Sequence, residues 1–427
     1  MKRTHDSQNN SRSIFKNMMI LATGTGFAKI VGILSMPFIT RIYAPEDMGA
    51  LAVFASMAAL LIPLGSLRYA VALPLPRHDA LALNLAVASF IFLIVITLIS
   101  TGFLFFAAEP IMSLLSMDKL HPYWWLLPIA IFGAGLYEIL NSWAIREKAF
   151  KPIAKTKVWQ SILGAVTQIG LGLIGLKPLG LLIGHIVLQT TGILSLAKIF
   201  TVKWKKYRAK LSWTKTQFLL RWYSDYPKYR LPSQFLLVFS MQAPLLFSAY
   251  LFGAETTGQL GLALMALALP VSLFGHTTGQ AYYAEIAKLG RKKPQKILKI
   301  TKNITLKLFA VSIPPFLILF FLGPWIFEIT FGSAWREAGV FASILATYLL
   351  LQFVSAPIVN ALSIFNNQRM FLSINIRRSV LLITVFTIAY FYSFSINTTL
   401  IIFSLVMSIH YAIVTLSIFR VIRKECL

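Results

Sequence analysis

The sequence has 427 residues, of which 57% are hydrophobic and only 13% are charged, and its mean hydropathy is +0.73. Soluble globular proteins have about half apolar and about a quarter charged residues, so this composition excludes a soluble protein and indicates a membrane protein. A net charge of +26 would suggest nucleic-acid binding in a soluble chain. Here the basic runs, such as KWKKYRAK (203–210), lie at the ends of apolar segments, where anionic lipid attracts them. No nucleic-acid partner is expected, because the longest polar connection (201–230) is too short to be a domain.

The apolar content is divided into segments of about 20 residues, the length that a helix needs to cross about 30 Å of hydrocarbon. We therefore predict an all-α polytopic membrane protein with twelve transmembrane helices. Those of the first half cover roughly residues 14–38, 48–72, 80–105, 123–145, 156–176 and 179–200. Those of the second half cover roughly residues 231–252, 258–284, 304–327, 338–364, 370–392 and 397–420.

The basic residues predict the orientation of these helices, because Lys and Arg are retained on the cytoplasmic side of a membrane. With a cytoplasmic amino terminus, 35 of the 40 Lys and Arg residues lie in or beside cytoplasmic segments. The exceptions are Arg41, Lys119, Lys177 and Arg336, which face outward, and Lys29, which lies within a span. Both termini are therefore predicted to be cytoplasmic. The first span is too long for a signal peptide, and we expect it to be retained.

An internal repeat predicts two related halves. IYAPEDMGALAVFASMAALLIP (42–63) and LFGAETTGQLGLALMALALP (251–270) share a Glu, a Gly three residues later and an apolar run ending in Pro. Six spans per half is an even number, so the halves have the same orientation. We expect an amino-terminal six-helix bundle (1–200), a basic cytoplasmic linker (201–230) and a carboxyl-terminal six-helix bundle (231–427), with the substrate path between the bundles.

Several apparent motifs predict no chemistry. GLGLIG (170–175) matches a dinucleotide-binding pattern, but no strand precedes it and it lies inside the fifth span, where small residues let helices approach closely. The six histidines have no metal-ligand spacing, and the one cysteine, Cys426, makes neither a disulfide nor a lipidation signal. No metal, cofactor or catalytic site is expected.

Several blocks of the sequence resemble one family. TRIYAPEDMG (40–49), LRYAVALPLPRHDALAL (67–83) and FKPIAKTKVWQSI (150–162) are similar to polysaccharide-unit flippases of the Wzx type. DYPKYRLPSQFL, FGAETTGQL and LPVSLFGHTTGQAYYAE (269–285) resemble them most. These flippases belong to the oligosaccharide flippase family, in the superfamily that includes multidrug exporters and the lipid II flippase. The similarity extends over nearly the whole chain.

This resemblance implies two six-helix bundles around a central cavity that work by alternating access. The substrate would be an undecaprenyl-diphosphate-linked oligosaccharide, moved from the cytoplasmic to the outer leaflet of a bacterial inner membrane for surface polysaccharide or lipopolysaccharide (O-antigen) synthesis. A proton or sodium ion is the candidate coupling ion. The chain departs from relatives at Ala70, where they usually carry Glu, and at Met265, where they often carry Arg. If these charges act in coupling or substrate selection, this chain does so differently.

With such a substrate, cationic side chains at successive depths are candidates for binding the diphosphate. A charge in the bilayer centre costs about 2.5 to 3.5 kcal/mol, so Lys29 is expected to face a wet cavity or a partner. Glu138, the one clear acidic residue within a span, is a candidate for that ion pair or for coupling. Adjacent arginines point about 100° apart, so one of Arg377 and Arg378 is expected to face the cavity. The candidate substrate-binding residues are Lys29, Arg68, Lys228, Arg230, Arg377 and Arg378.

The stretch DYPKYRLP (225–232) predicts an entry site. Pro232 suits the first turn of the seventh helix, whose free amides would face the cytoplasm beside Lys228 and Arg230, with Pro227 breaking any continuous helix from the linker. Interfacial anchoring by the tyrosines and basic side chains of this stretch is the equal alternative.

Two other functions are considered. A polytopic glycosyltransferase using lipid-linked sugars would need outer-loop carboxylates such as Glu46 and Asp47, but the matching Glu255 in the second half favours helix capping instead. A multidrug or cation exporter should carry more acidic residues within its spans. We therefore expect a transporter and no enzyme. The sequence does not identify the glycan, the energy source or the oligomeric state.

Overall fold

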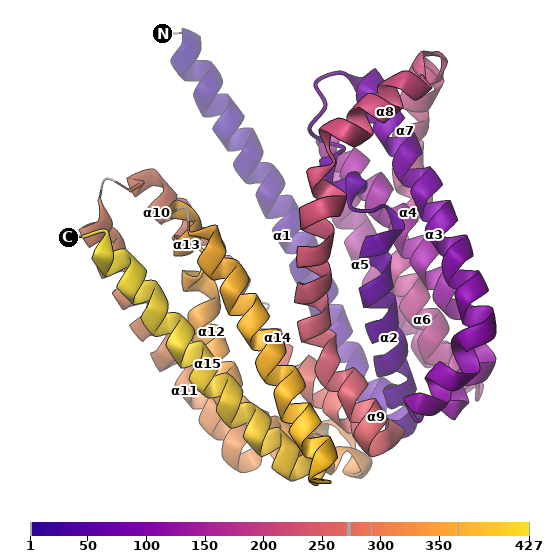
Figure 1. Ribbon diagram of the computed structural model, residues 1–427, viewed down its shortest axis with the longest axis vertical. Helices are drawn as coiled ribbons and strands as arrows, with labels where there is room; N and C mark the ends of the chain where they lie inside the picture. The colour runs from indigo at the N-terminus through magenta and orange to yellow at the C-terminus, as the bar shows by residue number, and fades with distance from the viewer. Residues whose placement is uncertain (1, 271–274, 292, 366, 427) are drawn as a thin grey trace. The chain divides into compact units, whose positions relative to one another are not determined.

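The computed structural model describes residues 2–270, 275–291, 293–365 and 367–426. Helices make up 89% of the structure, and no strand occurs in these ranges (Figure 1). Ten described helices are long and apolar enough to cross a membrane. The prediction of an all-helical, multi-pass membrane protein is confirmed.

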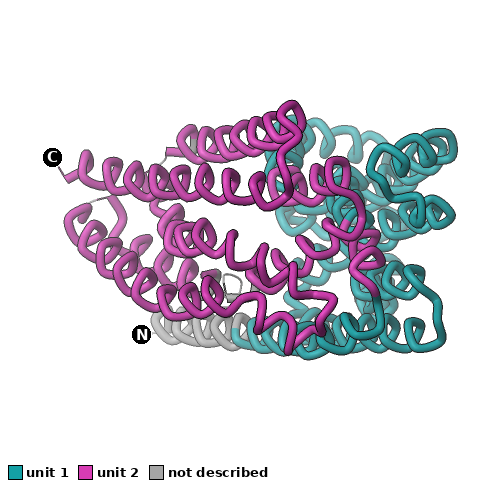
Figure 2. Tube along the Cα trace, turned by 90° about the horizontal axis from the view of Figure 1, so that it is seen from below, with its two compact units in different colours: residues 1–43, 53–238 teal, residues 44–52, 239–427 magenta. Residues whose placement is uncertain are grey.

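The chain divides into two compact units (Figure 2). Unit 1 comprises residues 1–43 and 53–238, and unit 2 comprises residues 44–52 and 239–427. The segment 201–230, predicted as a linker, is part of unit 1. The main helices of unit 1 are α1 (Lys2–Ile42), α3 (Asp79–Leu114), α4 (Leu126–Arg146), α5 (Phe150–Leu173), α6 (Leu179–Thr190), α7 (Ile193–Tyr207) and α8 (Trp213–Trp222). Its short helices are η1 (Tyr69–Ala72), η2 (Asp118–Tyr123), η3 (Arg208–Lys210) and the π-helix η4 (Tyr226–Arg230).

Unit 2 contains the remaining helices. These are α10 (His276–Leu289), α11 (Pro294–Phe331), η6 (Ser333–Trp335), α12 (Arg336–Ile358), α13 (Ala361–Ile364), α14 (Gln368–Phe391) and α15 (Ile396–Lys424). Two helices belong to both units, because the division falls inside α2 (Pro45–Gly65) and inside α9 (Leu231–Pro270).

The ten candidate spans differ from the predicted twelve at two places. The predicted spans 231–252 and 258–284 share one candidate, Tyr226–Ala268, because α9 is interrupted only by Gly253, whose φ of 82° and ψ of −176° are not helical. The second of these predicted spans also crosses residues 271–274, which lie outside the described residues. The predicted span 156–176 corresponds to α5, which is not a candidate span and buries the polar side chains of Gln160, Ser161 and Gln168. The number twelve stays a prediction.

The start of α2 is capped by its own carboxylate. The backbone N–H of Ala44 donates to Asp47 Oδ2 at 3.1 Å, and Asp47 is 7% exposed. The capping role predicted for this acidic pair is thus confirmed for Asp47, because its carboxylate satisfies an amide that the first turn leaves free. Glu255, the counterpart of Glu46 in the repeat, is exposed just after the break at Gly253.

The beginnings of the two copies of the internal repeat, which both belong to unit 2, lie against each other. A Cβ atom on Gly49 of α2 would lie 2.0 Å from the carbonyl oxygen of Ala254, and one on Gly258 of α9 would lie 1.8 Å from that of Pro45. The repeated glycines therefore allow α2 and α9 to pack backbone against backbone, as small residues do where membrane helices cross closely.

We expect Gly258→Ala to lower the free energy of unfolding by about 1 to 3 kcal/mol, because a methyl group at this crossing must push two backbones apart. Thermal unfolding in detergent measures this change. Gly102→Ala in α3 is the matched control, since a Cβ atom there meets nothing within 4 Å. Equal stability of the two variants would contradict the close crossing.

Candidate functional site

A strained turn after α2 carries Arg68. Leu67 and Arg68 have φ angles of 47° and 63°, in the left-handed region that residues other than glycine seldom adopt. The residues that follow hold the turn in place, because Tyr69 and Ala70 of η1 pack in a hydrophobic core with Trp143 of α4. This packing fixes a backbone conformation in which the Arg68 side chain reaches α4.

Arg68 forms an ion pair with Glu138 in the middle of α4. Arg68 Nη1 donates to Glu138 Oε1 at 2.8 Å, and the two side chains are 14% and 21% exposed. The structure thus assigns Glu138 a cationic partner, which is Arg68. Burial makes such a pair costly to break, because removing one charge leaves the other unpaired in a medium of low dielectric constant.

This ion pair leaves hydrogen-bonding capacity unused. Within the described part of the chain, Glu138 Oε2, Arg68 Nε, Asn141 Oδ1 and Ser66 Oγ are buried and have no hydrogen-bond partner. Buried polar atoms are usually satisfied, so the two unused atoms of the pair itself, Arg68 Nε and Glu138 Oε2, indicate a site that can accept water, a proton or a polar ligand.

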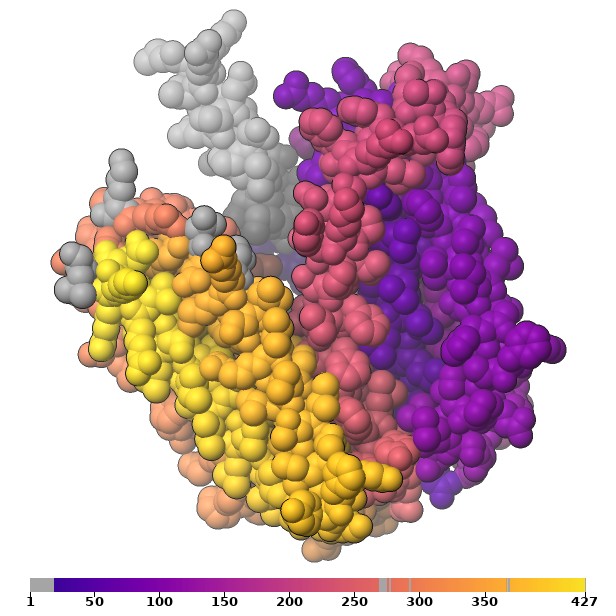
Figure 3. Space-filling view, viewed as in Figure 1, coloured from indigo at the N-terminus to yellow at the C-terminus, as the bar shows by residue number. Residues whose placement is uncertain are grey.

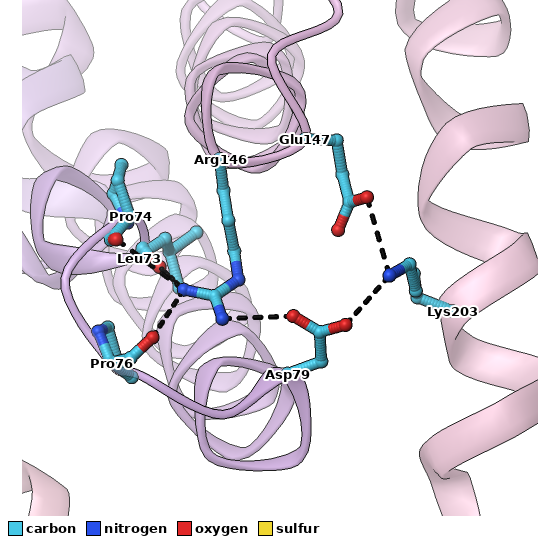
Figure 4. A network of polar contacts seen from close by, with 7 residues as sticks. All are labelled: Leu73, Pro74, Pro76, Asp79, Arg146, Glu147 and Lys203. Carbon is cyan, nitrogen blue, oxygen red and sulfur yellow. Dashed lines mark hydrogen bonds and ion pairs between the residues drawn. The ribbon is translucent and has the colours of Figure 1, made fainter. Parts of the chain in front are cut away.

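Arg146, the last residue of α4, fastens the loop that follows Arg68. Its Nη2 donates to Asp79 Oδ1 at 2.9 Å, and its Nη1 donates to the carbonyl oxygen of Pro76 at 2.6 Å. Figure 4 shows this guanidinium between the loop and the start of α3, with further contacts to the carbonyl oxygens of Leu73 at 3.3 Å and Pro74 at 3.5 Å.

Asp79 also joins this loop to α7. Lys203 Nζ lies 2.7 Å from Asp79 Oδ2 and 3.4 Å from Glu147 Oε2 (Figure 4). The two cations and two carboxylates of the network balance, so it closes the ends of α3, α4 and α7 without a net charge. We interpret this cluster as structural, because every charged group in it has a partner of opposite sign.

Arg378 of α14 lines a cavity of about 280 Å³ that lies wholly within unit 2. Its Nη2 contacts Ser240 Oγ of α9, and its buried Nε has no hydrogen-bond partner among the described residues. The polar and aromatic part of the wall comes from Tyr348, Gln352 and Tyr411. The apolar part comes from Met241, Pro244, Leu264, Ala268, Leu349, Leu382, Phe403 and Met407. The cavity therefore combines a cation with hydrogen-bonding groups and aromatic rings.

Arg377 contacts α15 instead. Its Nε donates to His410 Nδ1 at 3.2 Å, and it does not line the cavity beside Arg378. The 100° step between neighbouring helical residues explains why two adjacent arginines have different surroundings. His410 is 1% exposed, and its Nε2 has no hydrogen-bond partner in the described chain.

The other candidate cations lie in unit 1. Lys29 is half-buried on α1, and Lys228 and Arg230 are exposed on η4, which packs against η1. The structure therefore brings Lys228 and Arg230 onto an element next to Arg68, and it places Arg377 and Arg378 together in unit 2.

The predicted helix start at Pro232 matches the first turn of α9, which begins at Leu231, but a π-helix that was not predicted precedes it. The π-helix η4 runs directly into α9, so the amides after Pro232 are inside a continuous helical stretch, and Pro227 lies in the first turn of that stretch. The chain turns earlier, at residues 223–224. A proline inside a helix removes one hydrogen bond and crowds the preceding turn, and the wider π-helical turn before Pro232 relieves that conflict. The helical stretch that carries Lys228 and Arg230 therefore starts at η4, a few residues before Pro232.

Sequence reasoning missed several residues of these sites. Arg146, Asp79 and Lys203 each lie at a helix end and give no motif, and Ser240, Tyr348 and Gln352 are scattered over two helices. The structure shows where the two departures from the family pattern lie. Ala70 is fully buried in the core of unit 1, and Met265 is 48% exposed. A carboxylate at position 70 would have to enter that core.

The fold is shared by known transporters. The chain is similar to a lipid II flippase, MurJ, in an inward closed conformation, with 14% identity, a TM-score of 0.73 and coverage of 95% of this chain and 90% of that chain. It is also similar to an inward-facing multidrug resistance transporter of the MATE family, with 15% identity, a TM-score of 0.69 and coverage of 97% and 98%. A third similar structure is a transporter of the MOP superfamily from Pyrococcus furiosus, with 15% identity, a TM-score of 0.60 and coverage of 96% of both chains.

These likenesses define the class: the chain has the fold of MOP superfamily transporters. None of the curated protein sequences matches the chain significantly. The family profile described as "Polysaccharide biosynthesis protein" matches residues 38–340. The chain belongs to this family, as the sequence resemblance predicted.

Proposed function

We propose that the protein is a flippase for undecaprenyl-diphosphate-linked oligosaccharide units, which it moves from the cytoplasmic to the outer leaflet of a bacterial inner membrane by alternating access. The observation that carries the proposal is Arg378, a cation in a cavity of unit 2 in a chain of the polysaccharide biosynthesis family. A cation in this position suits the diphosphate, which is the charged part of such a substrate.

The cavity groups have the chemistry that this substrate needs. Arginine has five N–H donors in a planar fork that matches phosphate oxygens, and one Arg378 donor, Nε, is unused. Gln352 and the hydroxyls of Tyr348 and Tyr411 both donate and accept hydrogen bonds, which suits sugar hydroxyls. We propose Arg378 as the principal diphosphate contact, with Arg377 supporting it through His410.

In unit 1 we propose a second anion contact at Arg68. A proton on Glu138 would remove the charge that holds Arg68 and leave its guanidinium available for phosphate, so this pair is our candidate for coupling to a proton. Lys228 and Arg230 on the neighbouring η4 would attract the diphosphate at the headgroup level, and Lys29 would act deeper in the membrane. Sodium is the other candidate coupling ion.

Export of a drug or cation is the alternative, because the fold is shared with a multidrug resistance transporter. The contacts favour an anionic substrate: the cavity of unit 2 presents an arginine, and the ion pair with Arg68 occupies one oxygen of Glu138. An enzyme, such as a glycosyltransferase, is not favoured, because the compared structures are transporters or flippases. We propose that both termini are cytoplasmic.

The function is tested by deleting the gene and analysing lipid-linked glycans. We expect loss of a surface polysaccharide together with accumulation of complete lipid-linked repeat units on the cytoplasmic side, because a flippase acts after the unit is assembled. Failure to assemble the units would indicate a transferase. Normal surface polysaccharide with increased drug sensitivity would indicate an exporter.

A further inference from the structure

Helix α8 is firmly attached to unit 1 by its polar start. Asn84 of α3 is 1% exposed, and its Oδ1 accepts hydrogen bonds from the N–H of Ser212 at 2.9 Å and from the hydroxyl of Thr216 at 3.1 Å. Leu219 of α8 is buried in the hydrophobic core that also contains Tyr69 and Trp143. The helix is therefore a fixed part of unit 1, with one face packed against the protein.

The opposite side of α8 exposes large aromatic side chains. Phe218 and Trp222 are 58% and 70% exposed, and their rings stack with centroids 5.7 Å apart. They lie four residues apart, so they share one face, and Lys215 lies three residues before Phe218 on the same face. Gln217 and Arg221 occupy another side of the helix, which also exposes Trp213 at its start. The Phe218 and Trp222 face is therefore the one where two exposed aromatic rings stack.

The charged side chains of α8 and of the segment before it are all basic. Residues 201–224 contain no Asp or Glu. The exposed cations of this segment are Lys205, Lys206, Arg208, Lys210, Lys215 and Arg221. Figure 3 shows the segment at an outer edge of unit 1, where its side chains project from the surface seen in that view. Basic residues together with exposed Trp and Phe are typical of helices that lie in a membrane interface.

The same helix contacts the segment that carries Arg68. The hydroxyl of Tyr69 donates to the carbonyl oxygen of Leu220 at 3.0 Å. Leu219 and Leu220 pack in one hydrophobic core with Tyr69 and Leu73 of the strained segment. The position of α8 and the conformation of residues 66–76 are therefore mechanically connected within unit 1.

We propose that the face of α8 that carries Phe218 and Trp222 docks on an anionic bilayer surface. This docking stabilises the conformation of residues 66–76, the segment from which Arg68 reaches Glu138. Anionic lipid is the occupant that the charge favours, because all six exposed cations of the segment complement it. Lipid contact at α8 would in this way regulate the Arg68 site of the proposed transporter. The docking itself can be measured without measuring transport.

The docking is tested with the full chain in lipid nanodiscs. In a Cys426→Ser background, a nitroxide label is placed at Phe218→Cys or, as the matched control, at the neighbouring exposed Gln217→Cys. In discs with phosphatidylglycerol we expect label 218 to collide mainly with oxygen dissolved in the lipid and label 217 mainly with a water-soluble nickel chelate. In phosphatidylcholine discs, both labels should favour the chelate. A label at 218 that is equally exposed to water in both lipids overturns the proposal and indicates a face kept for a protein partner.

The connection to Arg68 is tested by amide hydrogen exchange of residues 66–76 in the same two lipids. We expect exchange to be several-fold slower with phosphatidylglycerol, and we expect Phe218→Ser combined with Trp222→Ser to remove that difference. The substitution Trp125→Ser, at an exposed Trp of unit 1 outside α8, should leave it unchanged. Equal exchange in the two lipids overturns the proposal. Since neither measurement needs a glycan, both outcomes are independent of whether the proposed transport function is correct.

Discussion

Replacing Arg378 with alanine is expected to reduce export of the polysaccharide on the order of 10- to 100-fold, while the protein stays in the membrane at normal abundance. The estimate follows from the loss of one hydrogen-bonded charge contact to phosphate, which contributes about 1.5 to 3 kcal/mol. Arg378→Lys should keep an intermediate activity, because an ammonium group retains the charge but cannot make a bidentate contact. Surface polysaccharide and accumulated lipid-linked units are the quantities to measure.

The matched control for this variant is Arg420→Ala. Arg420 lies on α15 of the same unit, is exposed and does not line the cavity. The Arg420→Ala substitution removes one positive charge from the same unit, so a general effect of net charge would appear in both variants. Normal export by Arg378→Ala at normal abundance would exclude the cavity as the diphosphate site.

Arg146→Met is expected to destabilise unit 1 by about 2 to 4 kcal/mol, because it deprives Asp79 of one partner and leaves the carbonyl oxygens of the Arg68 loop unsatisfied. The side chain is 9% exposed, so solvent compensates little. Thermal unfolding in detergent and abundance in the membrane measure the loss. Arg146→Lys should lie between the wild type and Arg146→Met, because lysine retains the charge beside Asp79 but cannot reach three carbonyl oxygens from one planar group.

Arg77→Met is the control for this second experiment. Arg77 lies in the same loop and is exposed, so removing it tests the effect of one lost cation near the membrane surface. We expect its unfolding temperature to be close to that of the wild type. If Arg77→Met and Arg146→Met lose the same stability, the network in Figure 4 does not fasten the loop.

The sequence predicted the helical content well, because the need to satisfy every backbone group inside a bilayer leaves few alternatives to an apolar helix. It also predicted a boundary between residues 252 and 258, where Gly253 interrupts α9. At Pro232 it predicted the first turn of α9 but not the π-helix η4 that precedes it, because no sequence pattern in this stretch distinguishes a π-helical turn.

The sequence did not predict which side chains contact each other in the candidate sites. Arg68 and Glu138 are 70 positions apart, and no periodic pattern indicates which faces of α4 and η1 meet. The sequence identified Arg378 as a candidate, but its cavity depends on how four helices pack. Likewise, no pattern in the sequence indicates that Asn84, inside an apolar span, accepts hydrogen bonds from Ser212 and Thr216 of the segment 201–230.

The crossing of α2 and α9 bears on how such a chain arose. Gly49 approaches the backbone of the second copy of the repeat, and Gly258 approaches the backbone of the first. Each copy thus uses its own glycine to admit the other, which is the relation that a two-fold axis imposes on a self-complementary interface between identical subunits. This reciprocity is expected if the two copies of the repeat arose by duplication of a self-associating segment. The contact constrains both glycines together, because enlarging either one displaces the same pair of backbones.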